Sequence, residues 1–197
     1  MASFHKARPS KNGHQPCFLD ELAENTAPTR KPPFAFLHTV DPHDPHTPQV
    51  PFLTFKKVDK KRERFAVSDE IRLQKSEGGL SREDIEYVMA LYDCEILHND
   101  FSFNEFLAIL KKKGWYEDSF VVLISDHGEQ FDEHGVLFHG SSIYNEEIHE
   151  PLLVKFPRQE FAGYQYESYV SQVDILPTIL ACLRYRIPSE VDGRSLI

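Results

Sequence analysis

The chain has 197 residues, the length of one domain or of a large piece of one. Its 41% hydrophobic and 27% charged residues are typical of a globular protein with enough apolar side chains for a core. A formal net charge of -9 excludes a general nucleic-acid binder, because a phosphate backbone is bound by a net basic surface. The longest purely apolar run, Phe120 to Ile124, is too short for a membrane span, and the three cysteines lie far apart without C-x-x-C spacing.

The N-terminal part of the chain shows little regular pattern. Residues 1–33 are rich in Pro, Asn, Thr, Lys and Arg, which predicts a poorly structured lead-in. Phe34–Val40 is nearly continuously apolar and predicts a strand that is buried on both faces. Four prolines in the following DPHDPHTPQVP exclude a helix and predict a rigid extended loop. The charged run Lys56–Arg64 is expected to be a solvated surface segment.

A long helix is predicted over Ser81–Lys113. Ser81 and Asp84 have the spacing of a capping box, and three lysines precede Gly114, as is typical of a helix C-terminus. The apolar residues that recur at helical spacing are expected to face the core: Ile85, Met89, Tyr92, Ile96, Phe103, Phe106, Leu107 and Leu110.

Two further strands and a last helix complete the predicted elements. Phe120–Ile124 and Leu152–Phe156 are short apolar runs that predict strands, and Asp174 is expected to cap a final helix that runs to Leu183. The alternation of buried runs with capped helical patterns predicts an α/β fold with a mixed, mostly parallel sheet flanked by helices.

Polar residues follow two of the predicted strands. In a mostly parallel sheet, ligands bind beyond the carboxyl ends of the strands. Asp126 and His127 follow the strand at Phe120–Ile124, whereas His38 and His43 lie at or just past the end of the first strand. A carboxylate and a neutral imidazole are suitable ligands for a divalent metal, although such an ion usually needs four or more donors. The alternative is that Asp126 is a turn residue that caps its own loop.

Other polar residues in this region carry weaker signals. His139 precedes Gly140 and is placed to reach the same crevice, and the alternative is a surface histidine. Asp132 and His134 are expected to be solvated or to support a metal ligand. A polar helix face is expected at Glu146, Glu147 and His149. These patterns by themselves predict an acid- and histidine-lined crevice on an α/β sheet.

Five stretches, in order along the chain, resemble the sulfatase family of the alkaline phosphatase superfamily. They are FLHTVDPHDPHTP, the long helix from YDCEILHND that leads into FVVLISDHGE, the S-D-H-G-E at Ser125–Glu129, EHGVLFHGSSIYNEEIHEPLLV, and VSQVDILPTILACLRYRIPSEVDGRSL. The resemblance implies an alkaline-phosphatase-like fold. It also implies a hydrolase of sulfate esters, while sister families act on phosphate esters or phosphonates.

The resemblance also implies roles for individual residues. Asp126 and His127 would be metal ligands, His139 would contact the oxyanion, and His43 would bind the ester and help to protonate the leaving group. His38 is a further substrate-binding candidate in the same crevice. The implied cofactor is a divalent ion, which is calcium, manganese or zinc. Many sulfatases have Asn at the position of His127, and a histidine there is similar to the phosphonate and phosphoglycerol-type branches, for which manganese or zinc is plausible.

One part of the family pattern is missing from this sequence. The N-terminal half of the family carries two metal-binding acids and a C-x-P-S-R-type nucleophile motif, whereas the cysteines here are followed by FLD, EIL and LRY. The resemblance therefore implies that residues 34–197 are the C-terminal part of an incomplete catalytic domain, to be completed by the missing half or by self-association. A phosphodiesterase or phosphoglycerol-transferase-type sister enzyme and a non-catalytic remnant that binds only partners are the alternatives.

Overall fold

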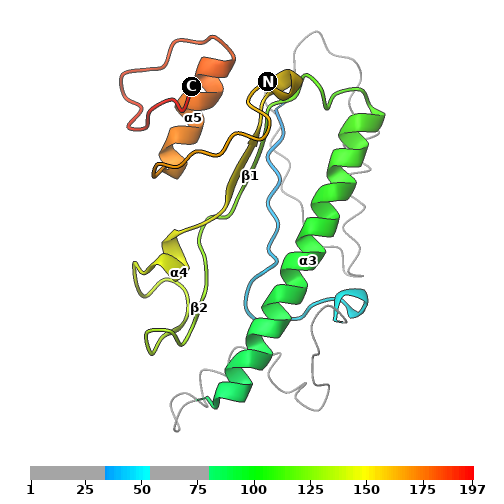
Figure 1. Cartoon of the computed structure of the whole chain (residues 1–197), viewed down its shortest axis with the longest axis vertical. Helices are drawn as coiled ribbons and strands as arrows, with labels where there is room; N and C mark the ends of the chain where they lie inside the picture. Colours follow the sequence, from blue (N-terminus) through cyan, green and yellow to red (C-terminus); the bar gives the residue numbers. More distant parts are fainter. Residues whose placement is uncertain (1–33, 54–79) are drawn as a thin grey trace. The chain divides into compact units, whose positions relative to one another are not determined.

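The computed structural model describes residues 34–53 and 80–197 (Figure 1). These residues divide into two compact units. The described residues of the first, the helix unit, are 34–53, 80–113 and 127–149; the second, the sheet unit, comprises Gly114–Asp126 and Glu150–Ile197. The predicted lead-in at residues 1–33 and the charged run Lys56–Arg64 lie outside the described residues.

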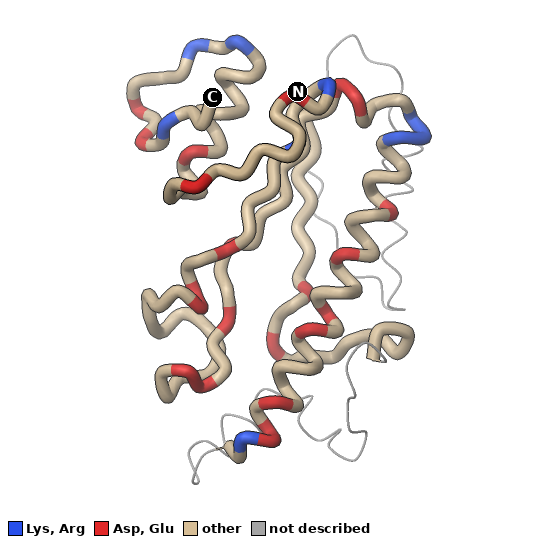
Figure 2. The backbone as a smooth tube through the Cα atoms, in the orientation of Figure 1, with Lys and Arg blue, Asp and Glu red and all other residues tan. Residues whose placement is uncertain are grey.

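The helix unit is built on the long helix α3 (Arg82–Lys112), which confirms the helix predicted over Ser81–Lys113. Its start is a capping box: the Asp84 N–H donates to the Ser81 side chain at 3.2 Å, and the Ser81 N–H donates to the Asp84 carboxylate at 3.2 Å. Acidic residues lie along the helix and lysines at its C-terminal end (Figure 2). The positive charge of these lysines interacts favourably with the negative end of the helix dipole.

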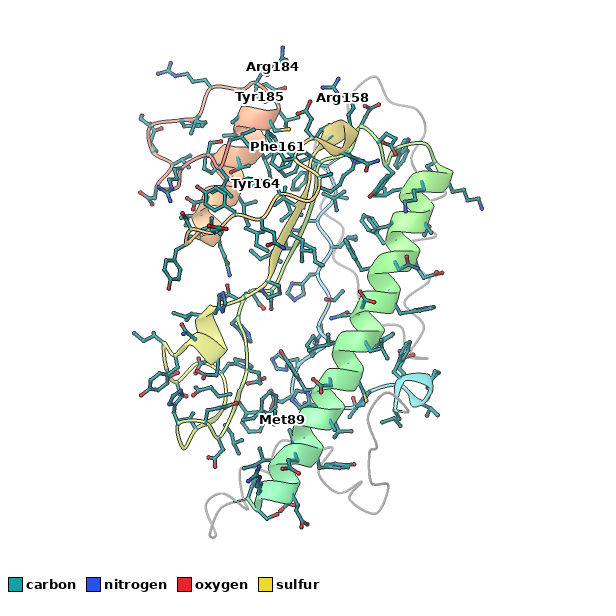
Figure 3. The ribbon with its side chains drawn as sticks, in the orientation of Figure 1. Met89, Arg158, Phe161, Tyr164, Arg184 and Tyr185 are labelled. Carbon is teal, nitrogen blue, oxygen red and sulfur yellow. The ribbon has the colours of Figure 1, made fainter. Side chains whose placement is uncertain are left out.

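The buried face of α3 differs from the predicted one. Its buried residues are Tyr87, Val88, Leu91, Cys94, Glu95 and His98. Met89, which is labelled in Figure 3, and Ile96 are 41% and 44% exposed, so the expectation that these two face the core is wrong. The reason is that α3 packs in part against a polar loop. Its buried face therefore includes Glu95 and His98, which cannot be found by looking for apolar residues at helical spacing.

The core of the helix unit lies between α3 and a short hairpin. Strand β2 (Gln130–Phe131) pairs antiparallel with β3 (Leu137–Phe138), and a four-residue helix, α4 (Asn145–Ile148), follows. The core cluster is Tyr87, Val88, Leu91 and Phe138, with Leu53, Leu80, Phe131 and Leu137 packed against it. Apolar burial therefore ties the hairpin to the N-terminal half of α3.

The prediction of a strand over Phe34–Val40 is wrong. The backbone there forms no strand, and Phe34 and Phe36 are 57% and 58% exposed. An apolar run predicts a tendency to be buried, but a strand also needs a partner for its N–H and C=O groups, and no described strand pairs with this segment. A 3-10 helix, η1 (Val50–Phe52), follows the proline-rich loop.

The sheet unit contains the two other predicted strands. Strand β1 (Val121–Ile124) pairs antiparallel with β4 (Leu152–Lys155), from Val121 opposite Lys155 to Ile124 opposite Leu152. Both predictions are confirmed to within a residue at each end. The two ladders among residues 34–53 and 80–197 are antiparallel, so the parallel pairings expected from the sequence are not found in this part of the chain.

Lys155 fixes the segment that leads into β1. Its Nζ donates to the carbonyl oxygen of Tyr116, to that of Glu117 at 2.8 Å and to that of Ser119 at 3.1 Å. The ammonium group also lies 4.5 Å from the centre of the Tyr116 ring, a cation–π contact. A single side chain on β4 thus satisfies three carbonyl groups before the neighbouring strand begins.

After β4 the chain forms a 3-10 helix, η3 (Pro157–Gln159), which contains Arg158, and then an aromatic segment with Phe161 and Tyr164; all three residues are labelled in Figure 3. The Phe161 ring packs edge-on against Phe156, at 5.1 Å between ring centres. Exposed aromatic residues continue to Tyr169, which is 96% exposed. None of the described helices is both long and apolar enough to cross a membrane.

The C-terminal residues are tied to the start of helix α5 (Ile175–Cys182), which follows the 3-10 helix η4 (Gln172–Asp174). The buried carboxylate of Asp174 accepts hydrogen bonds from the N–H of Arg194 at 2.8 Å and of Ser171 at 2.9 Å. Asp174 stands at the predicted start of the helix, but its carboxylate completes a capping box with Ser171 and does not cap α5.

The rest of this attachment is made by Thr178 and Gly193. Thr178 Oγ1 donates to the Asp174 carbonyl at 2.6 Å and accepts from the Leu196 N–H at 3.0 Å. A Cβ atom on Gly193 would lie 2.0 Å from the Val173 carbonyl oxygen, so only glycine fits the backbone contact. The D-I-L-P-T and D-G-R-S-L stretches thus form one hydrogen-bonded structure.

This arrangement predicts an acid-sensitive contribution of Asp174 to stability. The two N–H donors, Arg194 first, hold the pKa of Asp174 below its ordinary value of 3.8. A lowered folded pKa means that the stabilisation is complete above the ordinary value and is lost as the pH falls through the folded pKa. Asp174→Asn leaves one backbone donor without its acceptor, so we expect a loss of about 1–3 kcal/mol in the free energy of unfolding near pH 7.

Urea unfolding of the two proteins at pH 7 and at pH 3, followed by circular dichroism, measures this difference. We expect the gap between the native protein and Asp174→Asn to shrink at the lower pH, because below the ordinary pKa of 3.8 the unfolded chain binds a proton at this carboxyl group more readily than the folded chain does. The exposed Asp192 supplies the matched control, and Asp192→Asn should match the native protein. A gap of the same size at both pH values would contradict the assignment.

Candidate functional site

Three of the histidines singled out in the sequence meet in the helix unit. The rings of His127 and His139 stack with their centres 3.9 Å apart and their planes at 30°. The His43 ring meets that of His139 edge-on, with the centres 5.2 Å apart. These rings, the histidine cluster (His43, His127 and His139), come from two parts of the chain that are far apart in sequence. These three rings therefore lie together in the helix unit, while their place in a ligand-binding crevice stays a prediction.

Gly128 controls where His127 lies. Its N–H donates to the Glu147 carbonyl at 2.8 Å, and a Cβ atom on it would lie 2.0 Å from the Glu146 carbonyl oxygen. Only glycine allows this approach. His127 Nδ1 lies 2.9 Å from the Gly128 carbonyl oxygen, so a neutral ring donates there and carries its lone pair on Nε2, the nitrogen suited to bind a metal.

Glu129 holds His139. Its carboxylate oxygens lie 3.1 and 3.2 Å from His139 Nδ1, and the Glu129 side chain is buried. Burial raises the pKa of Glu129 above its usual value, while the charge and the hydrogen bond of His139 act in the opposite direction. Glu129 belongs to the S-D-H-G-E stretch, so the sequence contained the residue. What it could not show is that this acid faces an imidazole ten positions further along.

A second buried glutamate, Glu147, fixes the chain after His139. Its carboxylate accepts from the Gly140 N–H at 2.8 Å, from Ser142 Oγ at 2.8 Å and from Gln130 Nε2. These donors, Ser142 first, lower the pKa of Glu147. Because its side chain is buried, the prediction that Glu147 belongs to a polar helix face is wrong. The α4 segment is too short to form such a face, and its glutamate turns inward to satisfy backbone and side-chain donors.

The neighbouring polar residues are more exposed. His134 Nε2 lies 3.2 Å from a Glu146 carboxylate oxygen, and its ring stacks on Tyr144 with the centres 3.6 Å apart. Asp132 and His134 are exposed, as expected for solvated loop residues. Asp132 shapes the hairpin turn, since its carbonyl accepts from the Gly135 N–H at 3.1 Å.

The loop that carries His43 is attached to α3. His46 Nδ1 lies 2.8 Å from Glu95 Oε2, and the Thr47 N–H donates to Glu95 Oε1 at 2.6 Å. Asn99 Nδ2 donates to the Asp41 carbonyl oxygen. Sequence reasoning missed both His46 and Glu95. The only available signal was a glutamate on the apolar side of an amphipathic helix, and this does not show which loop it meets.

The two remaining candidates are His38 and Asp126. His38 is exposed, and the ring contact found for it among the described residues is with Phe36, at 6.4 Å between centres. Asp126 directly precedes His127 in sequence but belongs to the sheet unit, where its carbonyl oxygen accepts from Gln172 Nε2 at 2.9 Å. Within residues 34–53 and 80–197, no group of three or more His, Cys, Asp and Glu side chains could hold a metal ion.

Comparison with known proteins defines the class and then the family. The fold is of the alkaline-phosphatase-like α/β class, as predicted: the phosphonate monoester hydrolase of Agrobacterium radiobacter matches with a TM-score of 0.72 over 95% of this chain and 42% of its own, at 22% identity. The family model described as Sulfatase matches residues 6–185. The chain therefore belongs to the sulfatase family of the alkaline phosphatase superfamily.

The curated relatives that match over 120 residues include the following two. The multifunctional alkaline phosphatase superfamily protein PehA of Trinickia caryophylli is 34% identical, over 60% of this chain and 23% of its own length. Arylsulfatase K of Bos taurus is 32% identical, over 61% of this chain and 22% of its own length. The matched part thus spans less than a quarter of each of these relatives.

The close approach at Gly128 predicts a strong effect of one methyl group. Gly128→Ala places Cβ against the Glu146 carbonyl, and the backbone of the site must move, so we expect a loss near the upper end of the about 1–3 kcal/mol typical of overpacking. Gly135 is the control, because it has φ 73° and no atom within 4 Å of the added Cβ. Gly135→Ala should cost only about 1 kcal/mol of left-handed strain. Equal losses in urea unfolding would contradict the packing argument.

Proposed function

We propose that this chain supplies the substrate-contacting histidines and two metal ligands of a sulfuric ester hydrolase. The observation that carries the proposal is the histidine cluster, in which His43 and His139 lie with ring centres 5.2 Å apart. Two imidazoles at this separation suit a small tetrahedral group that must be contacted at an oxyanion and at a leaving-group oxygen.

His139 contacts the oxyanion. Glu129 orients its ring from the buried side, and a donor that is fixed before the reaction stabilises developing charge without reorganisation. His43 binds the ester and transfers a proton to the leaving oxygen, the role of a general acid. His38 remains a predicted substrate-binding residue that lies earlier in the same segment as His43.

Asp126 and His127 are the proposed metal ligands from this chain. A carboxylate and an imidazole suit zinc, manganese or calcium, in decreasing order of preference for nitrogen ligands, but two ligands do not make a complete site. The other ligands come from outside the described residues in this proposal, as does the nucleophile. When bound, the ion supplies Lewis-acid polarisation of the ester.

Hydrolysis of phosphonate or phosphate esters is the second candidate reaction. This second reaction is favoured by His127, because many sulfatases have Asn at the corresponding position. Imidazole is a better ligand for zinc and manganese than for calcium, and these metals suit phosphoryl chemistry. A direct comparison of ester classes separates the two reactions.

Hydrolysis tests the proposal directly. We expect the chain alone to hydrolyse nitrophenyl sulfate no faster than buffer, because covalent catalysis requires a nucleophile and this proposal places the nucleophile outside this sequence. With an added polypeptide that carries the nucleophile half of a related sulfatase, turnover should appear. It should then fall by about 10²-fold or more in His139→Ala, the scale of losing one oxyanion donor. The exposed His149 is the control, and His149→Ala should keep the activity.

Two results would contradict the proposal. The first is turnover by the purified chain alone that disappears in Asp126→Ala. The second is complemented activity that survives the loss of both His43 and His139. Faster turnover of a nitrophenyl phosphonate than of the sulfate would select the second reaction.

Metal binding gives a separate test. Calorimetry with manganese, zinc and calcium should detect weak binding by the chain alone, because two protein ligands leave the ion mostly hydrated. Asp126→Ala and His127→Ala should each abolish the heat of binding, whereas Asp132→Asn, in the exposed hairpin turn, should not. Tight binding that neither alanine variant changes would place the metal elsewhere.

A further inference from the structure

Glu95 is a carboxylate in the interior of the helix unit. It lies midway along α3, only 2% exposed, and both of its oxygens face the loop that carries His43. Oε2 lies 2.8 Å from His46 Nδ1, and Oε1 accepts the Thr47 N–H at 2.6 Å. The His46 side chain is 2% exposed. The pair thus fixes two consecutive loop residues from one point on the helix.

Stability alone is a poor explanation for this pair. Burial raises the pKa of Glu95, with the His46 hydrogen bond acting against it, so the charged form is held at an energetic disadvantage. His46 Nε2 is buried without a hydrogen-bond partner among the described residues, which costs about 1–3 kcal/mol. Apolar residues of similar volume often replace buried ion pairs without loss of stability. The directional contacts therefore call for another role.

The loop is also held at its other end. Asn99, one turn beyond Glu95 on α3, donates to the Asp41 carbonyl oxygen, and His98 Nδ1 lies 3.3 Å from the Asp41 carboxylate. His43 lies between the two attachments, at Asp41 on one side and at His46 on the other. Two prolines between the attachments reduce the freedom of the loop further. The position of His43 relative to α3 is therefore fixed from both sides.

We propose that Glu95 is a positioning residue for His43, which it holds against His139 through its contacts with His46 and Thr47. The inference rests on the proposed function for the catalytic role of His43. The placement of the His43 ring by Glu95 on α3 does not depend on the proposed function. Glu95 itself does not touch the substrate, and its removal should displace His43 while it leaves the stacked pair His127 and His139 in place.

Three substitutions in the full chain separate positioning from stability. Glu95→Leu fills the space but makes neither hydrogen bond. Glu95→Gln retains an oxygen for the Thr47 N–H and an NH₂ that can donate to the other tautomer of His46 Nδ1. Glu86→Leu, at an exposed glutamate of the same helix that pairs with Arg82, is the matched control.

The measurement is the nuclear Overhauser effect between histidine rings in the isotope-labelled chain. We expect Glu95→Leu to lose the His43–His139 effect and to keep the His127–His139 effect, at a temperature where circular dichroism shows that the variant is folded. Glu95→Gln and Glu86→Leu should keep both effects. General loosening of the unit would remove both together. Retention of the His43–His139 effect in Glu95→Leu, or loss of both effects, overturns the inference.

If Glu95→Leu does not fold, Glu95→Ala decides the question, because a water molecule can reach the two freed loop groups in the space that the smaller side chain leaves. The same selective loss is expected, whereas retention of both effects overturns the inference. In the complemented enzyme, Glu95→Leu should lower kcat by about 10- to 100-fold with little change in KM, the scale of an ångström-level misplacement. The measurement on the histidine rings does not require an active enzyme. If the complemented enzyme hydrolyses no ester, the proposed function is refuted, but the result on the positioning of His43 is unaffected.

Discussion

A buried carboxylate is unfavourable unless hydrogen-bond donors surround it, and this constraint organises the helix unit. Glu147 collects the donors of Gly140, Ser142 and Gln130, and thereby fixes the turn after His139. Glu129 faces the His139 ring, and Glu95 faces the loop that contains His43. Each acid must find particular partners, so the polar interior selects one arrangement of loops where apolar packing would tolerate several.

The same principle operates in the sheet unit. There Asp174 binds the N–H groups of Ser171 and Arg194, and Thr178 binds that of Leu196. The family stretch at the end of the chain is thus held together by hydrogen bonding within the unit itself. Membership of the sulfatase family accounts for the presence of these residues, and the geometry accounts for what they do.

Local signals predicted the elements well. The capping box at Ser81 and the lysines before Gly114 set the limits of α3, and short apolar runs identified β1 and β4. Non-local relations could not be predicted in this way. The apolar run at Phe34–Val40 gave no indication that its backbone lacks a described partner, and apolar spacing on α3 selected Met89 and Ile96 over the buried Glu95 and His98.

The candidate site shows the same division. Its residue types and the motif that contains Asp126, His127 and Glu129 were visible in the sequence. The contact of His43 with His139 was not, because it depends on a loop whose attachment to α3 involves Glu95 and His46, residues with no pattern of their own. The inward turn of Glu147 depends on backbone donors, which a sequence does not display.

Lys155 has a consequence for chemical labelling of the protein. Its amine contacts three carbonyl oxygens and a tyrosine ring, and a reagent that modifies the nitrogen must first displace these contacts. Acetylating reagents should therefore modify Lys155 slowly in the folded chain and at an ordinary rate once β1 and β4 separate. The acetyl group would then remove both the charge and two of the three donors, and the strands could not close again around the same contacts.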